Sequence, residues 1–465
     1  MHRSALIFLS RRRDAEARRN FLLKYVGRVL LFRPGIARRV RRTGPTLLLL
    51  LFAAPGFAQT PAPPAMERVT FEDAIQRALA NNPTIAGAAE AVLRAEGLLQ
   101  QARAATRPGV NAFVTNATLD TGRSFNGVVI QPRNQTAISA DLSMPVLAPA
   151  RWAAAAQARD QVDVANLMTA DVRKQIAVAA GQAYLAVITQ ERQLDVNQRA
   201  RESAQAHLDY AQRRLAQGAG TRLNELRAAQ EVAADEARLE NAGLAVRRAQ
   251  EALGVLLAAN TPVDAAAEPA FDIPPAAAIA DETAWMATRT DVRLSTATER
   301  AFERVWRDSF KDYFPTATAA FDPQLLTPSG AFTASRSWRF SLSLTAPIFD
   351  SGQRRGIARV RESAARASEF SLSNLQIQAR SEVRLAQETV RSTERALTSQ
   401  RLAAQEADEV LTITVTAFEA GATTNLEVID AQRSARDADA AAEIAADAVR
   451  RARLDLLTAL GRFPQ

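Results

Sequence analysis

The chain has 465 residues, of which 47% are hydrophobic, so it can bury a sizeable core and is not disordered along its whole length. It contains no cysteine, which excludes disulfides, thiolate metal sites, a cysteine nucleophile and a lipid-anchored cysteine. Its two histidines, His2 and His207, are too few for a histidine-rich zinc site. We therefore expect no metal and no other cofactor.

The formal net charge of +8 is concentrated near the N-terminus. Residues 1–43 hold 13 of the 58 basic residues but only two of the 50 acidic ones. The rest of the chain carries 45 basic and 48 acidic residues, so it is slightly acidic. The high isoelectric point is therefore no argument for a nucleic-acid partner, and we expect none.

Residues 38–58 have the layout of a secretory signal peptide. An arginine-rich stretch precedes the apolar run 46–54, and a small-x-small cleavage site ends at Ala58. The run is far shorter than the ~20 residues that a transmembrane helix needs. We expect residues 1–58 to be a cleaved leader and residues 59–68 to form a proline-rich tether.

The part of the leader before residue 38 has two possible interpretations. Arg18-Arg19 and the apolar residues after it resemble a twin-arginine export signal, but Arg28 and Arg33 interrupt what would be its apolar core. The alternative is a start site assigned upstream of the true leader. Sequencing the N-terminus of the precursor would separate the two.

The chain also repeats itself, which indicates two tandem copies of one unit. The sequence Ala-Val-Arg-Arg-Ala at 245–249 recurs at 448–452, a shift of 203 residues. Other segments match in the same order at shifts of 202 and 207, and alanine- and arginine-rich helices resembling one another by chance would not produce this order. We expect a first repeat at 69–260, a linker rich in alanine and proline at 261–280, and a second repeat at 281–461.

Short helices are expected at the start of each copy. Thr70 to Asp73 resembles a capping box that opens a helix ending at Asn82-Pro83. A second helix is predicted from about 83 to 105, and its counterpart in the second copy from about 291 to 313.

The hydrophobic period then changes from helical to two, as in a β-strand with one apolar face. Residues 337–346 alternate most strongly, and 136–144 follow the same pattern. Their partner strands alternate less cleanly, and loops expected at 122–135 and 323–336 join each pair. We expect one β-hairpin in each copy, at 109–145 and 315–347.

After each hairpin the helical pattern returns for a very long stretch. About 67 residues from 150 to 216, and a similar stretch from 353 to 420, contain no proline. Each ends in a glycine turn and returns as a helix of about 38 residues, which gives long helical hairpins at 150–259 and 353–461. The fold class is therefore mainly α with a small β part, although a plain coiled coil has the same helical signal.

The strand pattern has a physical consequence for assembly. A ten-residue strand with one apolar and one polar face fits a transmembrane β-strand. A sheet in lipid must close on itself, and four strands are too few to close. Three chains would supply twelve strands, so we infer a homotrimer with one shared barrel; a soluble hairpin packed on the helices is the alternative. The side chains predicted to face lipid are Trp338, Phe340, Leu342 and Leu344.

Taken together, these segments resemble the TolC-like outer membrane efflux proteins. The residues that carry the resemblance are the two copies, Asn82-Pro83-Thr-Ile85, Pro347 to Gln353 and Gly421 to Gln432. The resemblance spans 66–461. It implies a trimeric 12-strand β-barrel in the outer membrane, continued by an α-helical barrel through the periplasm. It further implies no enzymatic activity and partnership with a periplasmic adaptor and an inner-membrane pump, in drug efflux or type I secretion.

The resemblance also assigns roles to the tips of the helical hairpins, which close the periplasmic entrance and meet the adaptor. Glu427 and Asp430 lie three apart, on one helix face, and match the acidic pair at the entrance of family members. A solvated acidic face is the alternative. Thr423 replaces a basic residue there, which argues against an ionic latch at that position. The remaining predicted tip and aperture residues are Phe418, Gly218, Gly220, Thr221, Gly421 and Thr424.

A periplasmic adaptor or another structural coiled-coil protein is the main alternative function. Adaptors carry one long helical hairpin between compact β domains, whereas this chain has two, each with a short β-hairpin. An enzyme is disfavoured because one histidine outside the leader and no cluster of acids and bases leave little catalytic chemistry. The sequence does not name the cargo.

Overall fold

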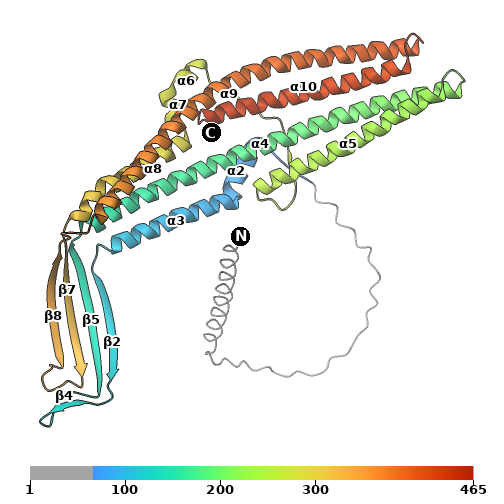
Figure 1. The fold of residues 1–465 in the computed structure, drawn as a ribbon. Helices are drawn as coiled ribbons and strands as arrows, with labels where there is room; N and C mark the ends of the chain where they lie inside the picture. The colour runs from blue at the N-terminus through green and yellow to red at the C-terminus, as the bar shows by residue number, and fades with distance from the viewer. Residues whose placement is uncertain (1–65, 464–465) are drawn as a thin grey trace, which may run out of the picture. The chain divides into compact units, whose positions relative to one another are not determined.

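The structure, a computed structural model, describes residues 66–463. The predicted leader and its cleavage site at Ala58 lie outside the described residues. As predicted, the described part is mainly helical with a small strand part (Figure 1). The main elements in chain order are α2 (Phe71–Asn81), α3 (Pro83–Ala104), β2 (Gly109–Thr118), β5 (Asn134–Leu147), α4 (Pro149–Ala216), α5 (Arg222–Leu256), α8 (Thr290–Arg307), β7 (Thr316–Thr327), β8 (Arg336–Thr345), α9 (Gln353–Glu419) and α10 (Asn425–Ala459).

Local capping sets the first two helices. The Thr70 hydroxyl accepts from the Asp73 amide, 3.2 Å away, and so caps α2. Asn82 ends α2, and its side-chain oxygen accepts from the Thr84 amide at 2.9 Å to cap α3. Pro83 stands at the first position of α3, where its missing N–H costs nothing.

The long helices form two antiparallel pairs, α4 with α5 and α9 with α10, which lie side by side in Figure 1. Helix α4 runs unbroken for 68 residues, roughly 100 Å at ~1.5 Å per residue. Gly181 does not break it. A Cβ at this position would lie 3.4–3.5 Å from Phe71, Leu454 and Phe463, so the small residue allows neighbouring side chains to approach α4.

The four main strands form a single antiparallel sheet with the order β2-β5-β7-β8. The hairpins expected separately in the two copies are joined by pairing between β5 and β7. In Figure 1 the sheet extends beyond the helix ends, and no helix covers either face. Strands β2 and β8 are the edges, and neither has a partner on its outer side among the described residues.

Two loop predictions are wrong in part. The expected loop at 122–135 contains the short hairpin of β3 (Arg123–Phe125) and β4 (Val128–Gln131). Its turn is Asn126-Gly127, and both residues have positive φ. This dipeptide is a strong hairpin signal, but the prediction from composition assigned it to the loop. Strand β7 also continues to Thr327, because Pro323 and the residues after it keep their register opposite β8.

The expected helix from about 291 to 313 is also modified. Helix α8 ends at Arg307, and a 3-10 helix, η2 (Asp308–Tyr313), follows it. The hydrophobic pattern alone does not distinguish the tighter 3-10 turn from a continued α-helix.

The segments expected as a tether and a linker meet in a two-stranded parallel sheet. Strand β1 (Glu67–Val69) pairs with β6 (Val263–Ala265), and the Arg68 guanidinium donates to the Asp264 carboxylate at 3.0 Å. Val69 and Val263 are buried in one cluster with Tyr184 of α4. Three-residue strands are too short to show a period, so composition alone indicated unstructured segments.

The main core lies where these short elements pack on the long helices. Short helices α6 (Ala276–Ala280) and α7 (Glu282–Thr288) precede α8, and Trp285 of α7 packs against α9 and α10. On the other side of α10, Leu454 and Leu457 pack with α2 and α4. The helices are thus tied together near the middle of their length, while the sheet and the hairpin tips extend from the packed region.

Candidate functional site

One face of the four-stranded sheet is apolar across all four strands. Residues paired in register share a face, and the pairing aligns Val114 with Ile138 and Ile138 with Leu325. The large apolar side chains on this face are all exposed, by 36–72%. They are Val110, Val114, Ile138, Leu142, Met144, Phe321, Leu325, Trp338, Phe340, Leu342 and Leu344.

The four residues predicted to face lipid, Trp338, Phe340, Leu342 and Leu344, therefore lie together on this face. They are among its most exposed members, at 64–71%. A soluble protein rarely leaves such a contiguous apolar surface uncovered. The face needs an apolar environment that the described residues do not supply.

The opposite face is mainly polar. It carries Asp141 and Ser139 of β5, and Asp322 of β7 faces Arg339 of β8. The Arg339 guanidinium donates from Nε and Nη2 to Asp322 Oδ2, both at 3.1 Å. Phe113 of β2 is an exposed apolar exception on this face. The apolar face carries polar residues only toward the end far from the helices, where Asn116 faces Thr136 and Arg336 faces Leu325. A sheet with one mostly apolar and one mostly polar face suits a boundary between lipid and water.

Exposed aromatic side chains gather where the helices give way to the strands. Three of them directly precede β7: Phe310, Tyr313 and Phe314. Trp152 lies near the start of α4, which follows β5. The Arg354 guanidinium lies over the Tyr313 ring, 5.3 Å from its centroid. Aromatic residues of this kind are enriched at the interface between membrane and water.

None of the helices within residues 66–463 combines the length and the hydrophobicity needed to cross a bilayer.

Both hairpin tips turn through a glycine in the left-handed region. Gly218 has a φ of 72° and Gly421 a φ of 80°. In each tip the amide that follows the glycine donates back to the preceding helix, from Ala219 to Arg214 and from Ala422 to Ala417. These bonds satisfy carbonyls that the helix end leaves free.

The helices that follow the tips are capped differently. Thr221 accepts from the Asn224 amide at 3.3 Å. Thr424 forms a complete capping box with Glu427, whose carboxylate accepts from the Thr424 amide at 3.1 Å. The predicted aperture residue Glu427 is therefore bonded to the helix end although it is exposed, and Asp430, one turn later, is exposed as well.

Phe418 was predicted to lie in the aperture, but its side chain is buried, 8% exposed. Its ring packs against His207 and Tyr210 of α4, with centroids 5.4 and 5.7 Å apart. The His207 ring nitrogen Nε2 lies 2.7 Å from Oδ1 of Asn425, the first residue of α10. Burial lowers the pKa of His207, although its bond to Asn425 acts in the opposite direction. The second tip is thus tied to the first hairpin.

Thr423 and Gly220 occupy matching positions in the two tips. The Thr423 hydroxyl reaches the Thr414 carbonyl of α9 at 3.5 Å. A Cβ on Gly220 would come within 2.9 Å of the Leu215 amide nitrogen, so that tip packs more tightly against its own helix.

The structure also contains a buried ion cluster between the hairpins that the sequence interpretation missed. Glu231 and Asp235 of α5 are 2% and 3% exposed. Arg433 donates to Glu231 at 2.9 Å, and Arg436 donates to Asp235 at 3.0 Å. Burial acts to raise the pKa of Glu231, but the bond to Arg433 and the nearby guanidinium charges outweigh it and leave the pKa below its usual value.

A sequence signal for this cluster exists. Two acids one turn apart in the first hairpin face two arginines three residues apart in the second. The two pairs have opposite charge and lie at similar distances from the tips of their hairpins. This match is visible only when the sequences of the two hairpins are aligned with each other.

Comparison with known proteins identifies the family. The profile described as "Outer membrane efflux protein" matches residues 74–259 and 324–462, most of the described chain. The chain belongs to this family. The family's channels are not enzymes, as predicted, and they act in efflux at the outer membrane. The match decides against the alternative of a periplasmic adaptor or a structural coiled coil.

Individual relatives of this efflux protein agree with that assignment. Outer membrane protein OprJ of Pseudomonas aeruginosa is 33% identical over 128 residues, an alignment that covers 26% of each chain. A solved membrane protein from Pseudomonas aeruginosa, 22% identical, superimposes with a TM-score of 0.74 over 85% of this chain and 91% of that one. CusC, solved in a study of transmembrane channel formation and 17% identical, gives 0.75 over 85% and 92%. At these identities the structures establish the shared fold.

Proposed function

We propose that this efflux protein is the passive exit duct of a tripartite efflux or type I secretion system, assembled as a homotrimer. The observation that carries the proposal is the four-stranded sheet with one exposed apolar face and with two edges that no strand within residues 66–463 covers. Four strands cannot enclose a pore, but three copies placed edge to edge would close a barrel of twelve.

The dimensions support a membrane position. The ten residues of β8 extend about 33 Å at ~3.3 Å per residue, close to the ~30 Å hydrocarbon core of a bilayer. The aromatic residues at the junction of sheet and helices would lie at the periplasmic interface. The polar sheet face, with Asp141 and Arg339, would then line a water-filled lumen that continues between the long helices.

The hairpin tips would form the periplasmic entrance and meet an adaptor that links the duct to an inner-membrane pump. The exposed tip residues Thr221, Thr424 and Asp430 are available for such contacts. Asp430 of three copies would bring three carboxylates to the entrance, with Glu427 close behind them. Export would require the leader at 1–58 to be removed after Ala58.

The edge pairing can be tested with cysteine pairs, because the chain has no cysteine of its own. Asn111→Cys on β2 would be combined in turn with Ser337→Cys, Ser341→Cys or Ser343→Cys on β8. All four positions lie on the polar face. We expect one pairing to give a covalent trimer on a denaturing gel and no larger ladder, while each single variant gives none.

The matched control is Ser143→Cys with Ala320→Cys, a pair that faces across β5 and β7 within one chain. Its disulfide should leave the apparent mass at that of one chain. Open-ended ladders, or purified protein that stays monomeric in detergent and never conducts ions across a planar bilayer, would contradict the proposal. Gene deletion followed by screens for drug sensitivity and for lost secreted proteins would separate efflux from secretion.

A further inference from the structure

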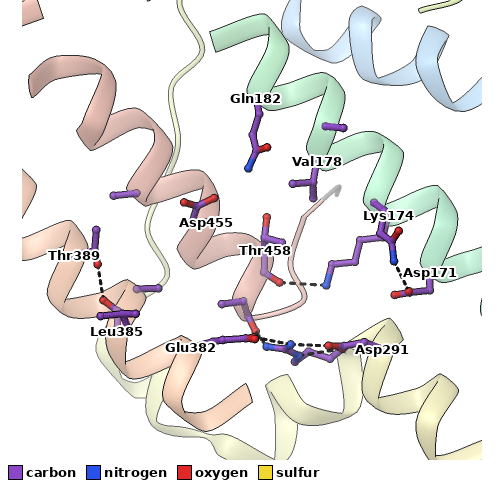
Figure 2. Close-up of a pocket in the computed structure, with 16 residues that line it drawn as sticks. Asp171, Lys174, Val178, Gln182, Asp291, Glu382, Leu385, Thr389, Asp455 and Thr458 are labelled. Carbon is purple, nitrogen blue, oxygen red and sulfur yellow. Dashed lines mark hydrogen bonds and ion pairs between the residues drawn. The ribbon is translucent and has the colours of Figure 1, made fainter. Parts of the chain in front are cut away.

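A groove of about 570 Å³ lies between the long helices α4 and α9 (Figure 2). Its walls come from α4 and α9, the C-terminal turns of α10 form its base, and the start of α8 closes one end. Its volume is in the range that takes a drug-sized molecule. Its lining residues come from four segments of the chain that are far apart in sequence.

At the closed end of the groove the charged groups satisfy one another. Arg289 is 5% exposed; it donates to both carboxylate oxygens of Asp291 and to Glu382, and its third nitrogen donates to the Ala459 carbonyl at 3.1 Å. The Lys174 ammonium donates to the Thr458 carbonyl at 3.2 Å. Both cations thus lie at the C-terminus of α10, where positive charge stabilises the helix end, and the Arg289 guanidinium is fully occupied by its partners.

The open part of the groove is different. Asp455 of α10 points into it beside the Gln182 amide (Figure 2), and it forms no ion pair within the described residues. Burial raises the pKa of the Asp455 carboxyl, although Gln182 and the charge of Arg451 act in the opposite direction. The Thr458 hydroxyl is buried without a hydrogen-bond partner. The remaining wall is apolar and includes Val178 and the 68% exposed Leu385.

This combination selects one class of ligand. Four carboxylates and two cations line the groove, so its formal charge is negative. One unpaired carboxylate beside an apolar wall suits a single positive charge on an apolar body. A metal ion would need several ligands, and residues 66–463 contain no group of three acidic or histidine side chains placed to hold one.

We propose that this groove binds amphipathic organic monocations, with Asp455 pairing the charge and Leu385 and Val178 contacting the apolar part. The inference rests on the proposed function, because it makes the groove a cargo subsite on the wall of the duct. Leu457 and Leu460 direct the other sides of α10 toward Ile75 of α2 and Trp285 of α7. The short helices α2 and α7 would block the tunnel if they lay inside it, so the sides of α10 that carry Leu457 and Leu460 face outward. Asp455 lies on the remaining side of α10, so the groove faces the tunnel.

The test uses a pair of ions of matched size and opposite charge. Purified full-length protein in zwitterionic detergent would be titrated with tetraphenylphosphonium and with tetraphenylborate, with empty micelles subtracted. We expect saturable binding of the cation alone. Asp455→Asn should weaken it about tenfold, since one charged contact is lost, and Leu385→Asn should weaken it through the apolar wall. Asp437→Asn removes the same charge from α10 about five turns away and should bind as the unaltered protein does.

Equal binding of both ions, or unchanged cation binding by Asp455→Asn and Leu385→Asn, would overturn the groove assignment. Conductance across planar bilayers is measured on the same preparations. Pores without selective cation binding would reject this inference and leave the duct proposal standing. Cation binding without pores would support the groove and reject the duct.

Discussion

The two helical hairpins share a fold but differ in the chemistry of their facing surfaces. The first presents buried acids, Glu231 and Asp235, and the second presents the arginines Arg433 and Arg436 that pair with them. The first tip is capped by Thr221 alone, the second by the reciprocal pair of Thr424 and Glu427. The two hairpins are thus complementary in charge where they meet, and the ion pairs link one to the other.

The largest effect should come from breaking that complementarity. Arg436→Met would leave two carboxylates buried with less compensation, so we expect a loss of about 3 kcal/mol in the free energy of unfolding. Thermal unfolding followed by circular dichroism in detergent measures it. Arg199→Met is the control, because Arg199 pairs with Asp439 across the same hairpins at 3.8 Å, where both side chains are exposed. It should cost under about 1 kcal/mol.

The same cluster predicts an acid response. The pKa of Glu231 is below its usual value in the folded chain, so its contribution is present above the unfolded-state pKa and is lost as pH falls below it. The difference in stability between the unaltered protein and Arg436→Met should therefore shrink in acid. A difference that stays constant with pH would mean that the ion cluster is not the cause.

A second response to acid should come from His207, with an effect smaller than that of Arg436→Met. Its pKa is lowered by burial, so the neutral ring stabilises the tip above the usual pKa of histidine, and the contribution is lost as pH falls below it. A charged ring would also face the positive end of α10. Charged side chains at the tips include Arg214 of α4, which lies over the Phe418 ring that packs on His207, Glu225 of α5 and Glu427 of α10. No ion pair to His207 is formed among the described residues.

Hydrogen exchange of residues 425–430, corrected for its intrinsic pH dependence, measures this. It should rise between pH 7.5 and 5 in the unaltered protein. In His207→Gln, which keeps a donor for Asn425 but does not titrate, the rise should be absent. The same rise in both proteins would reject the role of His207.

Removing the helix caps at the two tips should change stability by a smaller amount than Arg436→Met. Thr424→Ala combined with Glu427→Ala removes both bonds of the capping box and should destabilise the start of α10 by about 1 kcal/mol, whereas Thr221→Ala removes one bond and should cost less at the start of α5. Amide exchange over the first turn of each helix tests this. Equal protection losses would show that the difference between the two tips has no energetic consequence.

The smallest effect on stability, but a visible one on conduction, is expected from the tip acids. Glu427→Gln with Asp430→Asn keeps an acceptor for the capping box and removes the charge. Single channels in planar bilayers should lose sensitivity to block by multivalent cations while the assembly stays intact on gels. Unchanged block would place both carboxylates outside the conducting path.

Much of the fold could be predicted from residue patterns. The alternation in β8 and the long proline-free stretches of α4 and α9 fixed the class of each element because these periods persist over many residues. Patterns failed where elements were short. The three-residue strands β1 and β6 and the Asn126-Gly127 hairpin carry too few residues to show a period, so composition dominated the prediction there.

The candidate site divides in the same way. Periodicity placed Trp338, Phe340, Leu342 and Leu344 on one face, since side chains two apart on a strand point the same way. It could not show that Phe418 is buried, because that depends on which helix lies opposite. The bond from Glu427 back to the helix end is local, and Thr-x-x-Glu at 424–427 is a sequence signal for it that the prediction did not use.

By itself, the sequence determined that the chain is mainly helical, that two of its long strands are two-faced and that its net positive charge lies in residues 1–43. These properties are local, set by neighbours along the chain. Tertiary structure alone decided that β5 pairs with β7, that acids of one hairpin meet arginines of the other, and that Asp455 opens into a groove between α4 and α9. Such contacts join residues far apart in sequence, so they depend on how the helices pack.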